Sequence, residues 1–260
     1  MKTAQDFFLS LLPNATAISR EVSAKFFKKP LEEIGMVSKA DASPVTAADI
    51  EIESRLRDLI MKQFPDHGII GEEHGNHHTD AEYVWVLDPI DGTKSFITGV
   101  PLFTTLIALM HKGEPVCGAI YQPVLDELVW GNNKECFFND RPVRMRTAQN
   151  LADCTLLVTD ARHVAEHHPK ANFTGLSADV KFWRTWADGY GYALLAAGYA
   201  DIMIDPVMNP WDIMAVVPVV RGAGGTITDF AGADAVKGKS IVAASPGLHE
   251  QVLRRLGNAG

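Results

Sequence analysis

The chain has 260 residues, of which 47% are hydrophobic and 22% are charged, enough to bury a core in one large domain or two smaller ones. This composition excludes a disulfide-stapled mini-protein and a disordered chain. The net charge of −8 argues against a protein that coats nucleic acids or membranes, because phosphates attract Lys and Arg. A small phosphorylated substrate is compatible with this charge, since bound cations reverse the local field.

The N-terminal segment and the cysteines both indicate a cytoplasmic protein. The apolar cluster at residues 7–12 ends at Pro13, which favours an amphipathic first helix over a signal peptide. Cys117, Cys136 and Cys154 lie far apart, and such an odd, sparse count is typical of reduced thiols. No apolar run approaches the roughly 20 residues that cross a bilayer. We therefore expect neither a membrane nor a nucleic acid as a direct partner.

The first half of the chain is expected to form two helices and a β-meander. Apolar residues recur at helical spacing over residues 3–28, although Pro13 disfavours the start of that helix, and a second amphipathic helix spans residues 47–64. Short β-rich segments follow, and the last three come in succession without a helix, which indicates a meander and not a βαβ repeat. The predicted strands are residues 68–71, 83–87, 102–110, 116–121 and 127–131.

After about residue 146, helical and β-rich segments alternate. Such blocks predict a layered α+β sandwich within the α/β class, divided into subdomains at residues 1–145 and 146–260. The elements expected in the second half are strands at 155–159, 200–204, 226–229 and 240–244, and helices at 189–197, 211–221 and 246–256.

The strongest local signal is the motif DPIDGT, in which an apolar strand runs into an acidic turn. The strand delivers Asp88 at its end, a proline forces a turn, and Asp91 follows three residues after Asp88. The two carboxylates can converge, and the Ile90 carbonyl between them adds an oxygen of the kind that Mg²⁺ prefers. The amides of Gly92 and Thr93 would face a phosphate at a helix start. Taken alone, the same residues also suit an ordinary turn.

Four further acids lie in matching contexts, and each has a simpler explanation of its own. Glu72 and Glu73 end another short apolar strand, where paired carboxylates usually face water. Asp49 and Asp212 lie near predicted helix starts, where acidic side chains favour the helix dipole. The combination of the acids, more than any one of them, indicates a shared site.

In order and spacing, these acids resemble the motifs of the inositol monophosphatase superfamily of Mg²⁺-dependent, lithium-sensitive phosphatases. The resemblance covers residues 39–244 and implies a five-layer αβαβα fold and a homodimer. It is carried by residues 46–49, 71–73, 88–93 and 211–212, the last ahead of the glycine-rich segment 222–225.

The resemblance also implies a metal ligand set. Glu72, Asp88 and the Ile90 carbonyl would hold one Mg²⁺. Asp88 would bridge to a second ion, held with Asp91 and Asp212. Glu72 would reach a weaker third ion, so two to three ions are implied per subunit, with Mn²⁺ as an alternative metal. The N-terminal subdomain would then carry most of the ligands, and the C-terminal one would add Asp212.

Catalytic and supporting roles follow from the same resemblance. Thr93, hydrogen-bonded to Asp49, would orient the attacking water, and Glu72 would complete the catalytic set. The amides of Gly92 and Thr93 would bind phosphate. Glu73 and Lys39 would support the ligands without holding the metal themselves.

Within the superfamily, the chain is most similar to the histidinol-phosphatase branch, which implies a place in histidine biosynthesis. Asp188 and Asp205 would then accept charge-assisted hydrogen bonds from the substrate ammonium, although Asp188 also suits a helix N-cap. The matching segments are residues 39–49, 88–101, 121–124, 188–194 and 205–212.

Two alternatives stay open. One is an enzyme acting on inositol monophosphate or on another sugar or nucleotide phosphate. The other, of a different class, is a partner protein in a transcription complex with residual phosphatase activity. Five converging carboxylates favour catalysis, because a purely binding protein has no physical need for them.

Three remaining features have structural explanations that we prefer. The loop histidines His74, His77 and His78 suggest zinc, but their polar loop favours solvated side chains. The glycine-rich segment 222–225 follows a predicted helix, so it is interpreted as a helix stop and not as a phosphate loop. Three tryptophans are expected to be mostly core residues, with one edge facing the cleft able to contact an imidazole ring: Trp183, Trp186 and Trp211.

Overall fold

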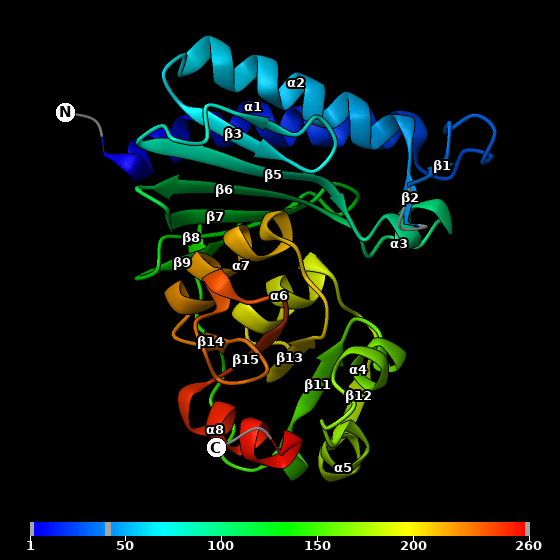
Figure 1. The fold of residues 1–260 in the computed structure, drawn as a ribbon, viewed down its shortest axis with the longest axis vertical. Coiled ribbons are helices and arrows are strands. Elements are labelled where there is room, and N and C mark those ends of the chain that lie inside the picture. Colours follow the sequence, from blue (N-terminus) through cyan, green and yellow to red (C-terminus); the bar gives the residue numbers. More distant parts are fainter. Residues whose placement is uncertain (1–2, 40–42, 258–260) are drawn as a thin grey trace.

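Two β-sheets, with helices outside and between them, form five layers in the order αβαβα (Figure 1). This layer order confirms the expected five-layer fold. The computed structural model describes residues 3–39 and 43–257. The outer helices on the first sheet are α1 (Ala4–Phe26) and α2 (Ala47–Gln63), the central layer holds α6 (Gly189–Ala196) and α7 (Pro210–Gly222), and the second sheet is covered by α4 (Ala161–His167), α5 (Phe173–Asp179) and α8 (Pro246–Leu256).

Helix α1 runs through Pro13 without ending there. Thr3 caps its start, and buried residues such as Leu11 and Ala15 lie on both sides of the proline. Pro costs a helix interior about 3 kcal/mol, so the packing of this buried stripe on the first sheet outweighs the local preference.

The first sheet contains the predicted meander. Its eight strands run in the order β10-β9-β8-β7-β6-β5-β3-β4, and only the β3–β5 pair among them is parallel. The strands are β3 (Gly68–Gly71), β4 (Asn76–His77), β5 (Tyr83–Asp91), β6 (Thr104–His111), β7 (Glu114–Gln122), β8 (Glu127–Gly131), β9 (Cys136–Phe138) and β10 (Arg141–Pro142).

Strand β5 continues beyond the predicted end at residue 87. Its pairing with β6 shifts register between Asp88 and Asp91, so the expected turn is a bulge within the strand. Bulges re-aim side chains, and this one turns the acidic motif toward the central layer. Helix α3 (Thr93–Ile97) follows directly, and a small hairpin of β1 (Val37–Ser38) and β2 (Pro44–Val45) lies before α2.

The second sheet has five strands in the order β12-β11-β13-β15-β14. Strand β11 is parallel to β12 and β13, and the other pairs are antiparallel. The edge strand β12 was missed from the sequence because all three of its residues are exposed and show no alternation. The strands are β11 (Thr155–Val158), β12 (Phe182–Arg184), β13 (Ile202–Asp205), β14 (Thr226–Thr228) and β15 (Ile241–Ala244).

The chain passes from the first sheet to the second between β10 and β11, across the predicted boundary at residue 145. Helices α6 and α7 nevertheless pack against both sheets, in a core that joins Val86 and Leu106 of the first to Leu157 and Met203 of the second. The division into two subdomains stays a prediction. Within the described residues, no helix has the length and apolar character needed to cross a membrane.

Candidate metal and phosphate site

Three carboxylates converge where the first sheet meets the central helices. Asp88 and Asp91 come from the bulged end of β5, and Asp212 from the first turn of α7. One ligand oxygen from each lies within 4.8 Å of the others. Of the described residues, these form the only group of three or more His, Cys, Asp or Glu side chains with metal-ligand spacing.

Burying these carboxylates close together is unfavourable unless a cation compensates their charge. Burial, and then the neighbouring carboxylates, raise the pKa of Asp88 and Asp91 well above the ordinary value, and burial raises that of Asp212 to about 6. Asp88 Oδ1 is buried without a hydrogen-bond partner. A set of oxygen donors with an orphaned buried oxygen fits a hard divalent cation such as Mg²⁺.

The bulge that carries the acids is held by hydroxyl groups. Thr105 Oγ1 donates to the Pro89 carbonyl at 2.7 Å and lies 2.7 Å from Ser19 Oγ of α1. Thr93 Oγ1 donates to the Ile90 carbonyl at 3.0 Å. The oxygen predicted as a metal ligand is thus oriented before any ion arrives.

Asp91 is positioned from the second half of the chain. The Gly189 amide, at the start of α6, donates to Asp91 Oδ2. A Cβ on Gly189 would collide with that oxygen and with Thr104 Oγ1, so glycine is required for this approach.

Lys39 joins the two adjacent glutamates. Its Nζ lies 2.7 Å from Glu72 Oε1 and 2.6 Å from Glu73 Oε1. Burial opposes the charge of Lys39, but the hydrogen bonds to both carboxylates raise its pKa overall, while burial raises the pKa of Glu73. Glu72 and Lys39 line the cavity that contains the acid group, and Glu73 is not in its lining. This geometry matches a supporting position for Glu73.

Glu53 fixes the loop after Glu72, and the sequence analysis did not identify it. Its carboxylate is fully buried and accepts the Glu73 amide at 2.7 Å and the His74 amide at 3.0 Å. Arg57 lies 3.5 Å away. The available signal was a charged residue on the apolar face of α2, one turn before the buried Leu56.

Asp49 does not make the predicted hydrogen bond to Thr93. Its Oδ2 accepts from the amide and the hydroxyl of Thr46, at 2.8 Å and 2.6 Å, in the capping box of α2. Oδ1 is buried and unpartnered, and burial raises the pKa of Asp49 to about 7. Because Thr93 donates to Ile90 instead, the simpler interpretation of Asp49 as a first-turn acid describes this structure. Its catalytic role stays a prediction.

The acid group opens into a cavity of about 620 Å³ between the two halves of the chain. Gly92 lines it in a left-handed conformation, with φ of 90°, at the N-cap of α3. Of the predicted site residues, the lining contains Lys39, Glu72, Asp88, Ile90, Asp91, Gly92, Thr93, Asp188 and Asp212. Trp211, for which contact with an imidazole ring was an open alternative, also lines the cavity. The sequence analysis gave no site role to the other lining residues, which are Ser43, Lys94, Ser95, Thr159, Asp160, His163, Thr185, Val207 and Asn209.

The two predicted substrate acids occupy different places. Asp188 lines the cavity, and its side chain makes no capping bond although it precedes α6. Burial raises its pKa to about 6, opposed by the charge of Lys94. Asp205 is buried and accepts a hydrogen bond from Thr159 Oγ1 at 2.7 Å, outside the lining. Direct contact between Asp205 and substrate stays a prediction, and in this structure one oxygen of the carboxylate accepts from Thr159.

The histidine loop does not form a zinc site in the described structure. His77 and His78 stack on each other at 4.0 Å, and His74 Nε2 lies 3.2 Å from the Ile50 carbonyl oxygen. None of the three belongs to the metal-ligand group. The glycine-rich segment 222–225 ends α7 and leads into β14, as predicted.

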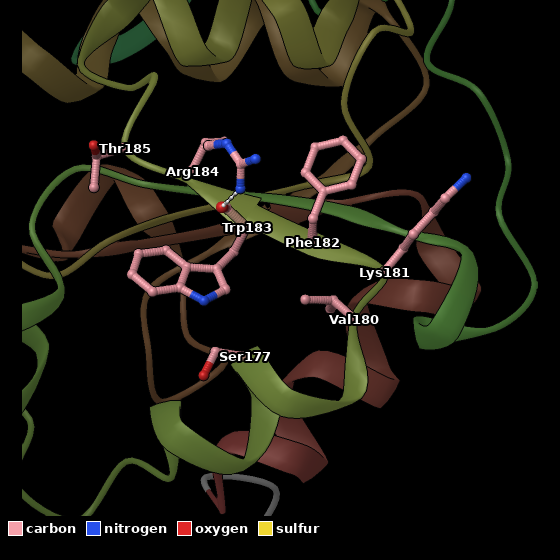
Figure 2. Close-up of a pocket in the computed structure, with 7 residues that line it drawn as sticks. All are labelled: Ser177, Val180, Lys181, Phe182, Trp183, Arg184 and Thr185. Atoms are coloured by element: carbon pink, nitrogen blue, oxygen red, sulfur yellow. Dashed lines mark hydrogen bonds between the residues drawn. The ribbon is translucent and has the colours of Figure 1, made fainter.

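The prediction of core tryptophans is wrong for two of the three. Trp183 and Trp186 are 37% and 46% exposed, because they lie on and just after the edge strand β12, while Trp211 lines the acidic cavity. A second hollow of about 600 Å³ lies along β12 (Figure 2). There, Arg184 donates to the Trp183 carbonyl and lies over the Phe182 ring. Among the described residues, the lining of this hollow contains no carboxylate, so these residues offer no acidic metal ligand there.

Known proteins and a family model match this chain over nearly its whole length. A model of the inositol monophosphatase family matches residues 9–260. The bifunctional phosphatase IMPL2 of Arabidopsis thaliana is 41% identical over 251 residues, covering 92% of this chain and 71% of its own. A histidinol-phosphatase of Chlorobaculum parvum is 34% identical, covering 93% and 96%. The solved structure of the suppressor protein suhB from Bartonella henselae superposes with a TM-score of 0.89 at 26% identity, covering 97% and 99%.

Proposed function

The chain belongs to the inositol monophosphatase family and is a metal-dependent phosphatase, and from that premise we propose that it hydrolyses histidinol phosphate to histidinol and phosphate. The observation that carries the proposal is the acid group of Asp88, Asp91 and Asp212 in a cavity that also holds Asp188. The first three acids suit a divalent cation, and the fourth suits a cationic substrate.

The metal ions would bind at the acidic end of this cavity. Mg²⁺ would be held by Asp88, Asp91, Asp212, Glu72 and the Ile90 carbonyl, in the expected two to three positions. The chemistry supplied by bound Mg²⁺, or Mn²⁺ in its place, is acidification of a water molecule and neutralisation of phosphoryl charge.

The remaining work falls to side chains and amides of the chain itself. The amides of Gly92 and Thr93 would donate to the phosphoryl oxygens. The Thr93 hydroxyl donates a hydrogen bond to the Ile90 carbonyl in this structure. Rotation of its side chain would let it orient the attacking water. The water oxygen bonds to phosphorus and gives up a proton, the P–O ester bond breaks, and the departing alkoxide oxygen takes up a proton and leaves as the alcohol. Lys39 would hold Glu72 in place.

Histidinol phosphate is favoured over inositol phosphate by charge. Its ammonium group matches Asp188, which no metal position requires, whereas inositol offers only hydroxyl groups. The Chlorobaculum relative, which carries the name histidinol-phosphatase, supports this choice.

The test is a comparison of kcat/KM for histidinol phosphate and inositol monophosphate, with Mg²⁺ supplied and removed. We expect a preference for histidinol phosphate above about tenfold, which equals about 1.4 kcal/mol. Asp88→Asn prepared in parallel measures contaminating phosphatase. A smaller preference, or the reverse one, contradicts the substrate and leaves the family activity intact.

Inositol monophosphate is the second candidate, because the matching family model carries that activity in its name. The partner protein of a transcription complex is the third. It requires a stoichiometric partner in a pull-down together with negligible turnover on every phosphate ester of the panel.

We further propose a cytoplasmic homodimer. The three cysteines are buried and unpaired, which suits a reducing compartment. Sedimentation velocity tests the assembly: a single species of about twice the 28.4 kDa chain mass supports the dimer, and a single species at the chain mass contradicts it.

A further inference from the structure

The cavity has an acidic wall that the metal chemistry does not use. Beyond the acids at the metal end, two carboxylates line the cavity among the described residues, those of Asp160 and Asp188. Asp188 lies close to the phosphate end, since a Cβ on Gly92 would come within 3.0 Å of its Oδ2. Asp160 follows β11 of the second sheet, whereas Gly92 follows β5 of the first. Asp160 therefore approaches a bound substrate from the end of β11 in the second sheet, and Asp188 from the start of α6.

Asp160 is built to stay charged. Burial opposes its ionisation, but the Arg162 and His163 amides and the side-chain charges of both residues lower its pKa below the ordinary value. Its Oδ1 accepts the Arg162 amide at 2.8 Å. By contrast, burial raises the pKa of Asp188 to about 6 and that of Asp205 further. The lowered pKa keeps Asp160 charged at neutral pH.

One oxygen of Asp160 is available to a ligand. The nearest cationic atoms to Oδ2 are Arg162 Nη2 at 3.7 Å and His163 Nε2 at 3.9 Å, both beyond hydrogen-bond distance. The Arg162 side chain is 82% exposed, so its competition is screened by water. Among the described residues, no side-chain cation lies within hydrogen-bond distance of Oδ2, so a donor in the cavity can approach this oxygen.

His163 extends this wall by one helical turn. It lines the cavity beside Asp160, and its ring meets that of His167 edge-on at 5.7 Å. A carboxylate with an aromatic ring three residues later on the same helix face offers one group for an ammonium and another for a flat ring.

We propose that Asp160 joins Asp188 in binding the ammonium group of a phosphorylated amino alcohol and so determines the substrate specificity of this phosphatase. The inference rests on the proposed function and deepens it. The phosphate lies at Gly92 and Thr93, and the amine reaches across to the second residue after β11. Thr159, held by Asp205, fixes the direction from which Asp160 enters the cavity. Asp205 is thereby a positioning residue.

The experiment compares histidinol phosphate with its desamino analogue, 3-(imidazol-4-yl)propyl phosphate, in the Mg²⁺-loaded protein. Asp160→Asn keeps the side-chain size and the capping ability and removes the charge. We expect its KM for histidinol phosphate to rise by about tenfold or more, and its KM for the analogue to change by less than about twofold. Asp160→Ser, another good N-cap, should behave in the same way. Asp234→Asn is the matched control, because Asp234 caps a short helix outside the cavity.

The outcomes separate the two levels of the proposal. Equal losses on both substrates, or none, in both Asp160 variants overturn the role of Asp160. A wild-type protein that does not distinguish histidinol phosphate from its analogue, and prefers inositol phosphate, overturns the proposed function itself. A selective loss that is confined to the amine-bearing substrate, and is absent in Asp234→Asn, supports both.

Discussion

Glu53 and Asp88 are both buried carboxylates, 0% and 2% exposed, but their surroundings differ completely. Glu53 receives two backbone amides and faces Arg57, so its charge is compensated inside the chain. Asp88 has an oxygen without a partner and lies among other acids. Glu53 therefore stabilises the fold through partners within the chain, whereas the charge of Asp88 requires compensation by a bound cation.

The largest expected effect is on activity at the uncompensated acid. Asp88→Asn should lower kcat at least about 100-fold at saturating Mg²⁺, because a bridging ligand touches both ions and its charge is lost to both. Glu73→Gln, next to the metal end but outside the cavity lining, should cost much less. Steady-state kinetics over a Mg²⁺ titration checks the pair. Near-wild-type kcat in Asp88→Asn would show that the two-metal assignment is wrong.

At the compensated acid, the expected effect is on stability. Glu53→Ala leaves the Glu73 and His74 amides and Arg57 without their acceptor, which should lower the free energy of unfolding by about 3 kcal/mol. Added Mg²⁺ should not restore the loss. Urea unfolding with and without the metal measures both quantities. Glu51→Ala, on the exposed side of the same helix, is the control and should change stability by less than about 1 kcal/mol. An equal loss in the two variants would contradict the assigned role of Glu53.

Specificity is expected to change moderately when Asp188 is neutralised. Asp188→Asn should raise KM for histidinol phosphate more than KM for an alkyl phosphate that lacks an amine. The ratio of the two changes should correspond to about 1.5–3 kcal/mol of binding free energy. Asp205→Asn should also raise KM mainly for histidinol phosphate, but by a smaller factor, since Asp205 acts through Thr159. Parallel KM determinations on the two esters test this order. Losses that are identical on both esters would assign these acids to folding or to metal binding.

The smallest expected effect is the pH dependence of the metal-free protein. The pKa of Asp212 is about 6 in the folded chain against an ordinary 3.8, so the folded state binds more protons between these values. Its stability should fall as pH rises from about 4 and level off above about 7. Asp212→Asn should therefore stabilise the metal-free protein by about 2 kcal/mol at pH 7.5, though it removes a metal ligand.

Thermal unfolding in a chelator across this pH range is the measurement. Saturating Mg²⁺ should flatten the wild-type profile, because the ion supplies the compensation that the chain lacks. A metal-free protein whose stability increases toward pH 7 would contradict the assigned charge repulsion.

Local patterns determined much of the fold. Helix α8 lies at Pro246–Leu256 and β8 at Glu127–Gly131, both with the predicted bounds, because a capped amphipathic repeat and an apolar run each bury a face whatever lies beyond them. The meander and the five layers also followed from the sequence and its resemblance. The short elements α4, α5 and β12 did not, since they have too few residues to show a period.

The sequence by itself also determined which residue types gather at the candidate metal site: acids at strand and helix ends, whose spacing in the DPIDGT motif reflects local geometry. Only the tertiary structure decided which acids are compensated, because compensation comes from partners distant in the chain. Gly189 donates to Asp91 from 98 positions away, Thr159 covers Asp205 from 46, and Glu53 reaches the Glu73 amide from 20. The cavity role of Asp160 depends in the same way on two sheets meeting, and no local pattern in its own segment records that encounter.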